Sequence, residues 1–187
     1  LRSTAIYRPF CKQAVYFDPV FNSVPGKNAT YFPTPHHQNI GFYVIGEGAA
    51  KDFSLIAIEA LPDVQLTGAQ SNGQFFPRWT YEKGADDGAL FDTGDGAVDE
   101  WGYRRVDNIT DAILSVYRAK FGPSVTKDDI FFYVYGVLHS TQYREAFAAD
   151  LKRMLPRIPL ASSTADFQTF AEAGRRLSDL HIGYEQM

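Results

Sequence analysis

The sequence predicts an α+β protein, in which a β-rich N-terminal half is followed by a helical bundle of about four helices. Short runs of β-branched and aromatic residues, separated by Pro, Gly and Asn, fill residues 1–81. A Gly- and Asp-rich stretch follows at 82–106, and from Asp107 onward apolar residues recur every three or four positions. We therefore divide the chain into a β-rich part at 1–81, an acidic loop or linker at 82–106 and a helical part at 107–187.

The strands of the first part are predicted from composition, because their residues favour a pleated, half-buried surface. The predicted strands are AVYFD at 14–18, ATYFP at 29–33, IGFYVIG at 40–46 and FSLIAIEAL at 53–61. The following LPDVQLTG is a candidate for one more strand. The segment GQFFPRWTY at 73–81 closes this part. Its Pro77 favours an edge strand or a loop, since proline cannot donate to a ladder.

The acidic segment has the composition of a mobile loop. Residues 82–100 carry seven acidic residues and one lysine, so DNA would repel this segment and we place it away from any groove. The motif DTGDG at 92–96 resembles half of a calcium-binding loop. The glutamate that would supply two ligands is absent, so a solvated loop is the better interpretation.

The helical part begins with a segment at 107–122 whose apolar residues have helical spacing and which stops at Gly-Pro. TKDD at 126–129 matches a capping box and opens a helix over 127–138. That helix is apolar on every side and far too short to cross a membrane, so we expect it to be buried inside the protein. The inward face of the first helix is predicted to hold Ile109, Ile113, Val116 and Tyr117.

Two further helices complete the predicted bundle. Ser140 is the expected N-cap of the third helix, which Pro156 ends. The last helix is predicted at 166–180. The segment 128–160 is therefore interpreted as a helical hairpin that forms core, and not as a cofactor site or a membrane span. The inward residues of these two helices are predicted to be Tyr143, Phe147 and Leu151, and then Phe167, Phe170, Ala171, Gly174 and Leu177.

Catalytic motifs are missing from the sequence. It has no Asn/Asp-Pro-Pro-aromatic turn for adenine methylation, no Gly-x-Gly-x-x-Gly for a dinucleotide or S-adenosylmethionine, and no Gly-x-x-x-x-Gly-Lys-Ser/Thr loop for phosphates. LPD at 61–63 begins like a metal-dependent nuclease motif, but no Glu/Asp-x-Lys follows within reach. We therefore predict no catalytic residue, no metal ligand and no cofactor in this chain.

The histidines and the single cysteine favour structural roles. His36 and His37 are adjacent and would point to opposite faces of a strand, so they are not a predicted metal pair. His139 and His181 lie at helix ends, where the helix dipole accounts for them. Cys11 is the only cysteine, which excludes an internal disulfide and indicates a reducing, cytoplasmic setting. With no signal peptide and a start in mid-pattern, the chain is expected to be a fragment of a larger protein.

Basic residues in or beside the loops of the β-rich half are candidates for DNA contacts, because Arg and Lys bind phosphates and guanine edges. A surface salt bridge is the alternative for each of them. The cluster at 152–157 lies at a helix C-terminus, where the dipole alone explains it. The candidate basic residues are Arg8, Lys12, Lys51, Arg78, Arg104 and Arg105.

Several stretches resemble one family, and they occur in the order typical of that family. Together they are similar to the C-terminal specificity domain of type ISP restriction–modification enzymes, and the resemblance covers almost the whole chain. The stretches are YRPFCKQAVYFD at 7–18, NIGF at 39–42, FSLIAIEALPDVQL at 53–66, FFPRWTY at 75–81, DNITD at 107–111, the helical motif with YGVLHS, YRE and PRIP at 126–160, and FAEAGRRLSDLHIGYE at 170–185.

The resemblance implies a parent polypeptide of bacterial defence that carries a nuclease, an ATP-driven translocase and an adenine N6-methyltransferase. Its cofactors would be S-adenosylmethionine, ATP and Mg, none of them bound by this chain. This domain and the methyltransferase domain would hold double-stranded DNA between them, with no membrane involved. The domain would read an asymmetric sequence in the major groove, and the target adenine would be flipped into the methyltransferase pocket. The helical part would dock on the methyltransferase domain.

The resemblance also narrows the candidate residues. Residues 7–10 would mark the exit from the methyltransferase domain, with Phe10 packed and Arg8 either contacting DNA or paired internally. Arg and Lys pair with guanine, and Asn and Gln pair with adenine. The predicted base readers in the β-rich half are Lys12, Gln13, Lys51, Gln70, Asn72, Gln74 and Arg78.

Two other functions stay open at this point. One is a non-catalytic protein-interaction or scaffold domain of a helicase-like protein, with the helical bundle as the binding part. The other is a small enzyme such as a nuclease, against which the missing carboxylate, lysine and histidine constellations argue. Salt-dependent binding of duplex DNA separates the DNA reader from the scaffold, and metal-dependent nicking would reveal the nuclease.

Overall fold

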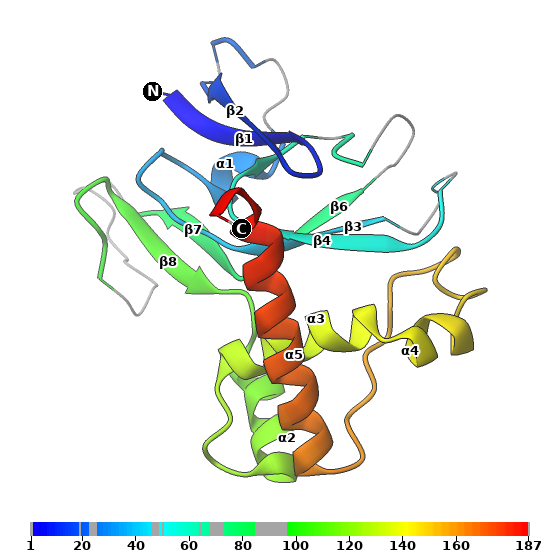
Figure 1. The fold of residues 1–187 in the computed structure, drawn as a ribbon. Coiled ribbons are helices and arrows are strands. Elements are labelled where there is room, and N and C mark those ends of the chain that lie inside the picture. Colours follow the sequence, from blue (N-terminus) through cyan, green and yellow to red (C-terminus); the bar gives the residue numbers. More distant parts are fainter. Residues whose placement is uncertain are drawn as a thin grey trace.

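The computed structural model describes residues 2–18, 20–22, 26–45, 49, 51–63, 65–67, 73–84 and 97–186. Within these residues the strands lie in the N-terminal part and the long helices in the C-terminal part, which confirms the predicted α+β class. Figure 1 shows the sheets above the helices, with the last long helix rising from the helical part to the sheets.

The described strands form three small sheets. The first has the order β2-β1-β5, with β1 and β2 antiparallel and β5 parallel to β1; the second has the order β4-β3-β6 and is antiparallel throughout; the third is the antiparallel pair β7-β8. The strands are β1 (Arg2–Arg8), β2 (Cys11–Tyr16), β3 (Gly41–Ile45), β4 (Ser54–Ile58), β5 (Leu61–Pro62), β6 (Gln74–Pro77), β7 (Trp79–Lys83) and β8 (Tyr103–Asp107).

The second sheet is the middle layer of the molecule and is buried on both faces. Alternate residues of β3 and β4 point to opposite sides: Phe42 and Ala57 join the core formed with the helices, whereas Tyr43 and Ile58 join a second core that includes Ile6 of β1. Burial on both sides explains why these strands read as continuous apolar runs in the sequence. The β1–β2 hairpin therefore covers one face of the sheet and the helices cover the other.

Side-chain caps fix where the helices begin. Thr110, Thr126, Ser140 and Ser163 each accept a hydrogen bond from a backbone N–H of the first turn. The predicted capping box of Thr126 with Asp129 and the predicted cap of Ser140 are both confirmed. The helices are α1 (Asn28–Tyr31), α2 (Asp111–Phe121), α3 (Lys127–His139), α4 (Thr141–Ala146) and α5 (Thr164–Ile182), followed by the 3-10 turn η1 (Tyr184–Gln186).

Helices α3 and α5 touch backbone to backbone at two glycines. A Cβ atom on Gly136 would lie 2.2 Å from the carbonyl oxygen of Phe170, and one on Gly174 would lie 2.0 Å from that of Phe132. No real Cβ atom tolerates such distances, so both positions require glycine. The sequence analysis placed Gly174 on the inward face, and the structure shows that the contact there is with main-chain atoms.

In the N-terminal part and the acidic segment, the structure differs from the predicted elements in three places. Residues 28–31 form the short helix α1 where a strand was predicted, and β1 was not singled out as a strand. The segment 82–106 is not a linker at its ends, because Lys83 and Tyr103 pair across the β7–β8 ladder. Residues 85–96 lie outside the described part.

The helical part differs in detail as well. Helix α4 ends at Ala146, ten residues before Pro156. On α2 the buried residues are Tyr117 and Phe121, whereas Ile113 and Val116 are about half exposed. Helical spacing correctly indicated an apolar face, but tertiary packing covers only its C-terminal end. No helix in the described ranges is long and apolar enough to cross a bilayer.

We expect the substitution Gly136→Ala to destabilise the protein, although alanine is the better helix former by about 1 kcal/mol. The added methyl group forces α3 and α5 apart, which costs about 2–3 kcal/mol net as overpacking. Denaturant unfolding measures the change. The exposed Ala173→Gly on α5 is the control and should cost about 1 kcal/mol. A Gly136→Ala protein as stable as the wild type would contradict the close crossing.

Candidate nucleic-acid interface

Two of the predicted basic residues meet at one edge of the β-rich part. Arg8 ends β1, and its guanidinium donates to the carbonyl oxygen of Gln65 at 2.9 Å and lies 3.8 Å from the carboxylate of Asp63. The Lys51 ammonium donates to the carbonyl oxygen of Thr67 at 2.6 Å. Segment 65–67 therefore joins the two cations into one edge, which we name the loop rim and define as Arg8, Lys51 and residues 65–67.

Two of the predicted amide readers lie on strands β2 and β6, and the other two fall outside the described residues. Gln74 is exposed at the start of β6, the edge strand of the middle sheet. Gln13 is exposed on β2, opposite Ala5 in the hairpin, and no hydrogen bond of its side chain is found within the described part of the chain. Gln70 and Asn72 fall in the segment 68–72, which the structure does not describe.

Lys12 points away from solvent, toward the end of α5. Its ammonium lies 3.5 Å from the carboxylate of Glu59 and 3.4 Å from that of Glu185. Burial alone would lower the pKa of Lys12, but the hydrogen bonds and charges of these two carboxylates raise it above its ordinary value. With both carboxylates in contact, this cation is engaged inside the protein.

Arg78 is buried between the sheets and the helices. Only 5% of its surface is exposed, its Nε donates to Asp128 at 2.8 Å, and its guanidinium also pairs with Asp107. Asp107 ends β8 and Asp128 lies in the first turn of α3. Arg78 therefore connects the third sheet to the helical part, and we do not count it in the candidate interface.

Arg104 and Arg105 are neighbours on β8 and point to opposite sides of the strand. Arg104 donates to the carboxylate of Glu82 at 2.7 Å, while the Arg105 guanidinium lies 4.7 Å from the centre of the Trp79 ring. Both belong to the β7–β8 ribbon, which in Figure 1 extends to the left, whereas β4 and β6 extend to the right. The ribbon is thus a surface separate from the loop rim.

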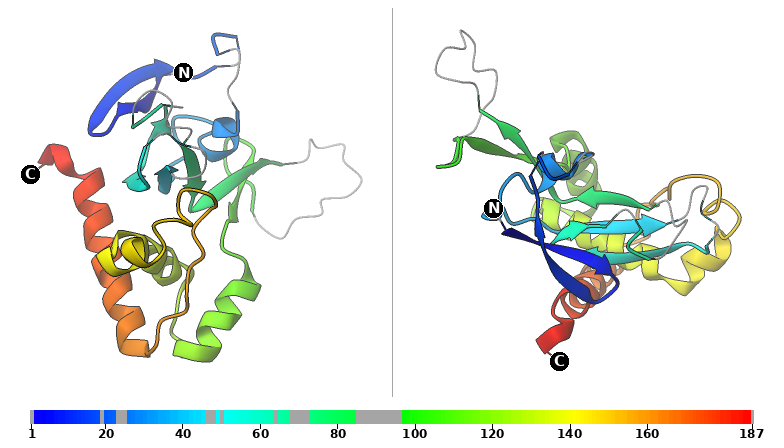
Figure 2. Two further views of the ribbon diagram at one scale, coloured as in Figure 1. Left: turned by 90° about the vertical axis from the view of Figure 1, so that its right-hand side faces the viewer. Right: turned by 90° about the horizontal axis from the view of Figure 1, so that it is seen from above.

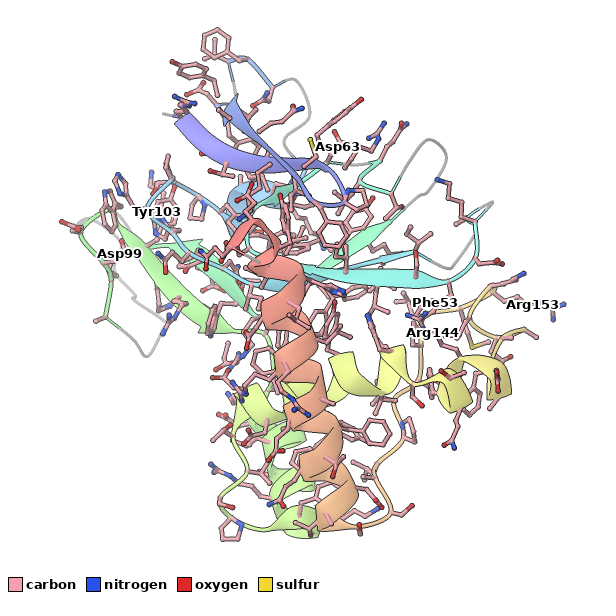
Figure 3. All side chains as sticks on the ribbon, in the orientation of Figure 1. Phe53, Asp63, Asp99, Tyr103, Arg144 and Arg153 are labelled. Carbon is pink, nitrogen blue, oxygen red and sulfur yellow. The ribbon has the colours of Figure 1, made fainter. Side chains whose placement is uncertain are left out.

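A histidine–aromatic cluster near the outer end of the ribbon, where Lys83 pairs with Tyr103, was not found from the sequence. The buried His37 ring bonds to the hydroxyl of Thr34 at 2.7 Å and to the carboxylate of Asp99 at 2.8 Å, with Tyr81 and Tyr103 in T-shaped contact with it. Figure 3 shows Asp99 and Tyr103 on this side of the molecule. The aromatic residues of WTYEK at 79–83 and YRRV at 103–106 are the sequence pattern that could have indicated this cluster.

A second cluster is formed by the rings of Tyr135, His139 and His181. It shows that the helix dipole does not account for His139. This ring lies in the last turn of α3, where a dipole favours the charged form. Burial wins over the dipole, and together with the charge of Arg144 and the ring of His181 it lowers the pKa of His139 to about 4. Burial likewise lowers the pKa of His181. The Nδ1 atom of His181 forms a hydrogen bond with the Tyr135 hydroxyl, which accepts another from the backbone N–H of Ala57 at 2.8 Å.

Metal chemistry finds no support in the described ranges, where no group of three or more His, Cys, Asp or Glu side chains is arranged to hold an ion. His36 stacks on Trp101 with ring centres 4.7 Å apart, whereas His37 has separate partners. What the geometry offers is an exposed edge with cations and amides, on which phosphates and base edges find donors.

A family model described as Type ISP C-terminal specificity domain matches residues 2–187. A comparison with curated proteins gives no match. Among solved structures, the cryoEM structure of a DrdV–DNA complex contains a similar region with a TM-score of 0.81 and 31% sequence identity, over 100% of this chain and 16% of that chain.

Two further similar structures are of enzymes named as Type ISP. One is a nuclease-deletion mutant of the restriction-modification enzyme LlaGI in complex with a DNA substrate mimic, with a TM-score of 0.72 and 35% identity over 98% of this chain and 14% of that chain. The other is the ATP-dependent enzyme LlaBIII bound to DNA, with a TM-score of 0.78 and 25% identity over 100% and 11%. The present chain spans less than a fifth of each of these longer chains.

We expect Arg78→Met to act on stability and not on DNA contacts. The substitution leaves Asp128 without this cation and Asp107 with Lys127 alone, and because both carboxylates are partly exposed we expect a cost of about 1–2 kcal/mol. Denaturant unfolding tests this, with Lys152→Met as the control because the Lys152–Asp52 pair is exposed and worth less than about 1 kcal/mol. If Arg78→Met lost DNA binding at unchanged stability, Arg78 would belong to the candidate interface.

We expect the free energy of unfolding to fall in acid partly through His139. The pKa of this ring is lower in the folded protein than in the unfolded chain, so the stability it contributes is present above about pH 6.5 and is lost as pH falls toward 4. The loss is roughly 2–3 kcal/mol between pH 7 and pH 4. The variant His139→Gln should show a correspondingly flatter pH dependence.

The comparison uses the difference between wild-type and variant unfolding curves, so that the shared carboxylates cancel. Measurements from pH 7 to 9, where the ring is neutral in both states, give the pH-independent cost of the substitution. Parallel curves for the two proteins from pH 7 to 4 would show that burial does not keep this ring neutral.

Proposed function

Because the chain belongs to the family of Type ISP C-terminal specificity domains, we propose that it reads the DNA target sequence of a Type ISP restriction–modification enzyme. The observation that carries the proposal is the match over residues 2–187, joined to whole-length similarity with regions of enzymes whose structures contain DNA. The DNA in those structures is bound by chains several times longer, so the recognition role of this chain is our inference.

The loop rim and the outer face of the β1–β2 hairpin form the proposed reading surface. Gln13 and Gln74 offer exposed amides of the kind that pair with adenine, and Arg8 and Lys51 offer cations for phosphate or guanine. Arg8 is also held by Gln65 and Asp63, and this contact orients its guanidinium at the rim. The predicted readers Gln70 and Asn72 lie outside the described residues and stay predictions.

We assign recognition to this chain and the chemistry to the rest of the parent polypeptide. The target would be an asymmetric duplex sequence, presented so that the methyltransferase domain methylates an adenine at N6. S-adenosylmethionine, ATP and Mg would belong to the methyltransferase, translocase and nuclease domains. This proposal gives no catalytic residue to the present chain.

A second surface favours docking of the helical part on another protein surface. An apolar cavity of about 580 Å³ opens between the middle sheet, α2, α3 and the segment 155–160. The opening of this cavity is lined by four residues that are 39–50% exposed, namely Ile113, Val116, Leu155 and Leu160. An apolar opening of this kind costs free energy in water and suits a protein partner. We propose the methyltransferase domain of the same parent chain as that partner.

Selection from a randomised duplex pool at low salt, repeated at higher salt, tests the reading function. Recovery of one asymmetric motif whose binding weakens with salt would support it. Binding without enrichment of a motif would indicate that the chain contacts only phosphates. Absence of duplex binding at low salt would favour the protein-interaction alternative.

We expect substitutions on the reading surface to separate base contacts from phosphate contacts. Gln13→Ala should relax one position of the selected motif at a cost of about 1–3 kcal/mol, whereas Lys51→Ala should weaken binding to all sequences and lower the salt slope by about one. Filter binding or anisotropy on the selected and a scrambled duplex measures both effects. Gln168→Ala on α5 and Lys120→Ala on α2 are matched exposed controls. Indistinguishable behaviour of test and control variants would remove the hairpin and the rim from the interface.

A further inference from the structure

The turn of the β1–β2 hairpin is held by the C-terminal end of the chain. Phe10 has a φ of 61°, which L-residues rarely adopt, and its ring meets Tyr184 edge-on at 5.1 Å and His181 at 6.0 Å. The ammonium of Lys12 lies 3.4 Å from the carboxylate of Glu185 and 5.5 Å from the centre of the Tyr184 ring. We name His181, Tyr184 and Glu185 the C-terminal clasp.

The clasp is itself anchored to the middle sheet. The backbone N–H of Ala57 on β4 donates to the hydroxyl of Tyr135 on α3, and that hydroxyl bonds to His181. Figure 2 shows the end of α5 beside the β1–β2 hairpin in both views. A continuous path of contacts therefore runs from β4 through Tyr135 and His181 to Phe10.

Beneath the hairpin lies a cavity of about 500 Å³, so the hairpin is not packed on the core along its length. Ser3, Thr4 and Lys12 line it from the hairpin side, and His37 and Asn39 line it from below. Elsewhere the hairpin is joined by the buried Ile6, by a β1–β5 pairing of two residues, by the contacts of Arg8 with Gln65 and Asp63, and by the Lys12–Glu59 pair. The clasp adds the contacts at the turn itself, so the orientation of the turn depends on it.

Strand geometry passes this orientation to the proposed readers. Neighbouring residues of a strand point to opposite sides, so Lys12 faces the clasp while Gln13 faces solvent. We propose that His181, Tyr184 and Glu185 are positioning residues for target reading, which set the hairpin against the DNA without touching it. The inference rests on the proposed function, because it gives the clasp a role at that same reading surface.

Because Glu185 is charged, its substitution can distinguish a positioning role from a direct electrostatic effect on DNA binding. A carboxylate repels phosphates, so its removal by Glu185→Gln raises affinity for any duplex if charge alone matters. A positioning role has the opposite consequence for the selected duplex, since a displaced hairpin loses base contacts. The ratio of affinities for selected and scrambled duplexes is therefore the decisive quantity.

The experiment combines hydrogen exchange of the free chain with duplex binding. For Glu185→Gln we expect backbone amides of β1 and β2 to exchange about fivefold to tenfold faster, with α2 unchanged. We expect the preference for the selected duplex to fall about tenfold, with affinity for the scrambled duplex unchanged or higher. Tyr184→Ala should act in the same direction, because it removes the ring that Phe10 and Lys12 contact.

Matched variants control for charge, ring and fold. Glu185→Asp keeps the carboxylate and should restore most of the preference. Tyr184→Phe keeps the ring that Phe10 and Lys12 contact but loses the hydroxyl, which meets Glu185 at 3.4 Å and the backbone of Lys12, so its effect on both readouts should be smaller than that of Tyr184→Ala. Glu172→Gln makes the same acid-to-amide change at an exposed site of α5 and should alter neither readout.

Two results would overturn the inference while the proposed function stands. One is unchanged exchange of the hairpin in Glu185→Gln and Tyr184→Ala. The other is faster exchange with an unchanged preference for the selected duplex. A wild-type chain without any sequence preference would instead overturn the proposed function and the reading role of the clasp with it. Hydrogen exchange would still show in that case whether the clasp holds the hairpin.

Discussion

The close crossing of α3 and α5 is the constraint on which the rest of the structure depends. At Gly136 and Gly174 the two helices approach through main-chain atoms, with no room for a Cβ atom on either side. The approach lets α5 cross α3 closely and continue upward to the sheets, as Figure 1 shows. The C-terminal clasp reaches the β1–β2 hairpin only because α5 has this direction.

The same crossing explains the polar contact at the centre of an otherwise apolar interface. Tyr135 is fully buried on α3, so its hydroxyl needs partners in a medium that offers no water. It finds them in the backbone N–H of Ala57 and in Nδ1 of His181, which lie on β4 and α5. A helix further from α3 would leave the hydroxyl without its histidine partner. Burial of apolar surface is not directional. The hydrogen bonds of Tyr135 therefore orient α3 against β4 and α5.

The sequence predicted most of the helical part and the middle sheet for local reasons. The capping box of Thr126 with Asp129 and the all-apolar character of α3 depend on neighbours within a few residues, so they are visible in one dimension. The run at 29–33 has strand-like composition but forms α1, and the exposed face of α2 at Ile113 and Val116 looks apolar all the same. In these places tertiary packing determines the secondary structure and the burial, and the local sequence pattern does not indicate that packing.

The candidate site was harder to predict because charge is not a local property. Arg78 has the chemistry of a base reader, yet its partners Asp107 and Asp128 come from distant segments and hold it inside the protein. Lys12 likewise meets Glu59 and Glu185. Nothing in the few residues around either cation indicates these partners.

Of the predicted basic readers, Lys12 and Arg78 are engaged inside the protein, and the whole chain carries a formal charge of −4. General attraction to phosphates is accordingly a weak contribution from this chain. Under the proposed function, sequence preference would come from where neutral amides such as Gln13 are placed, and the affinity from contacts elsewhere in the parent polypeptide. Placement depends on rigid support, so contacts far from the proposed reading surface, in the helical part, would then affect what the hairpin reads.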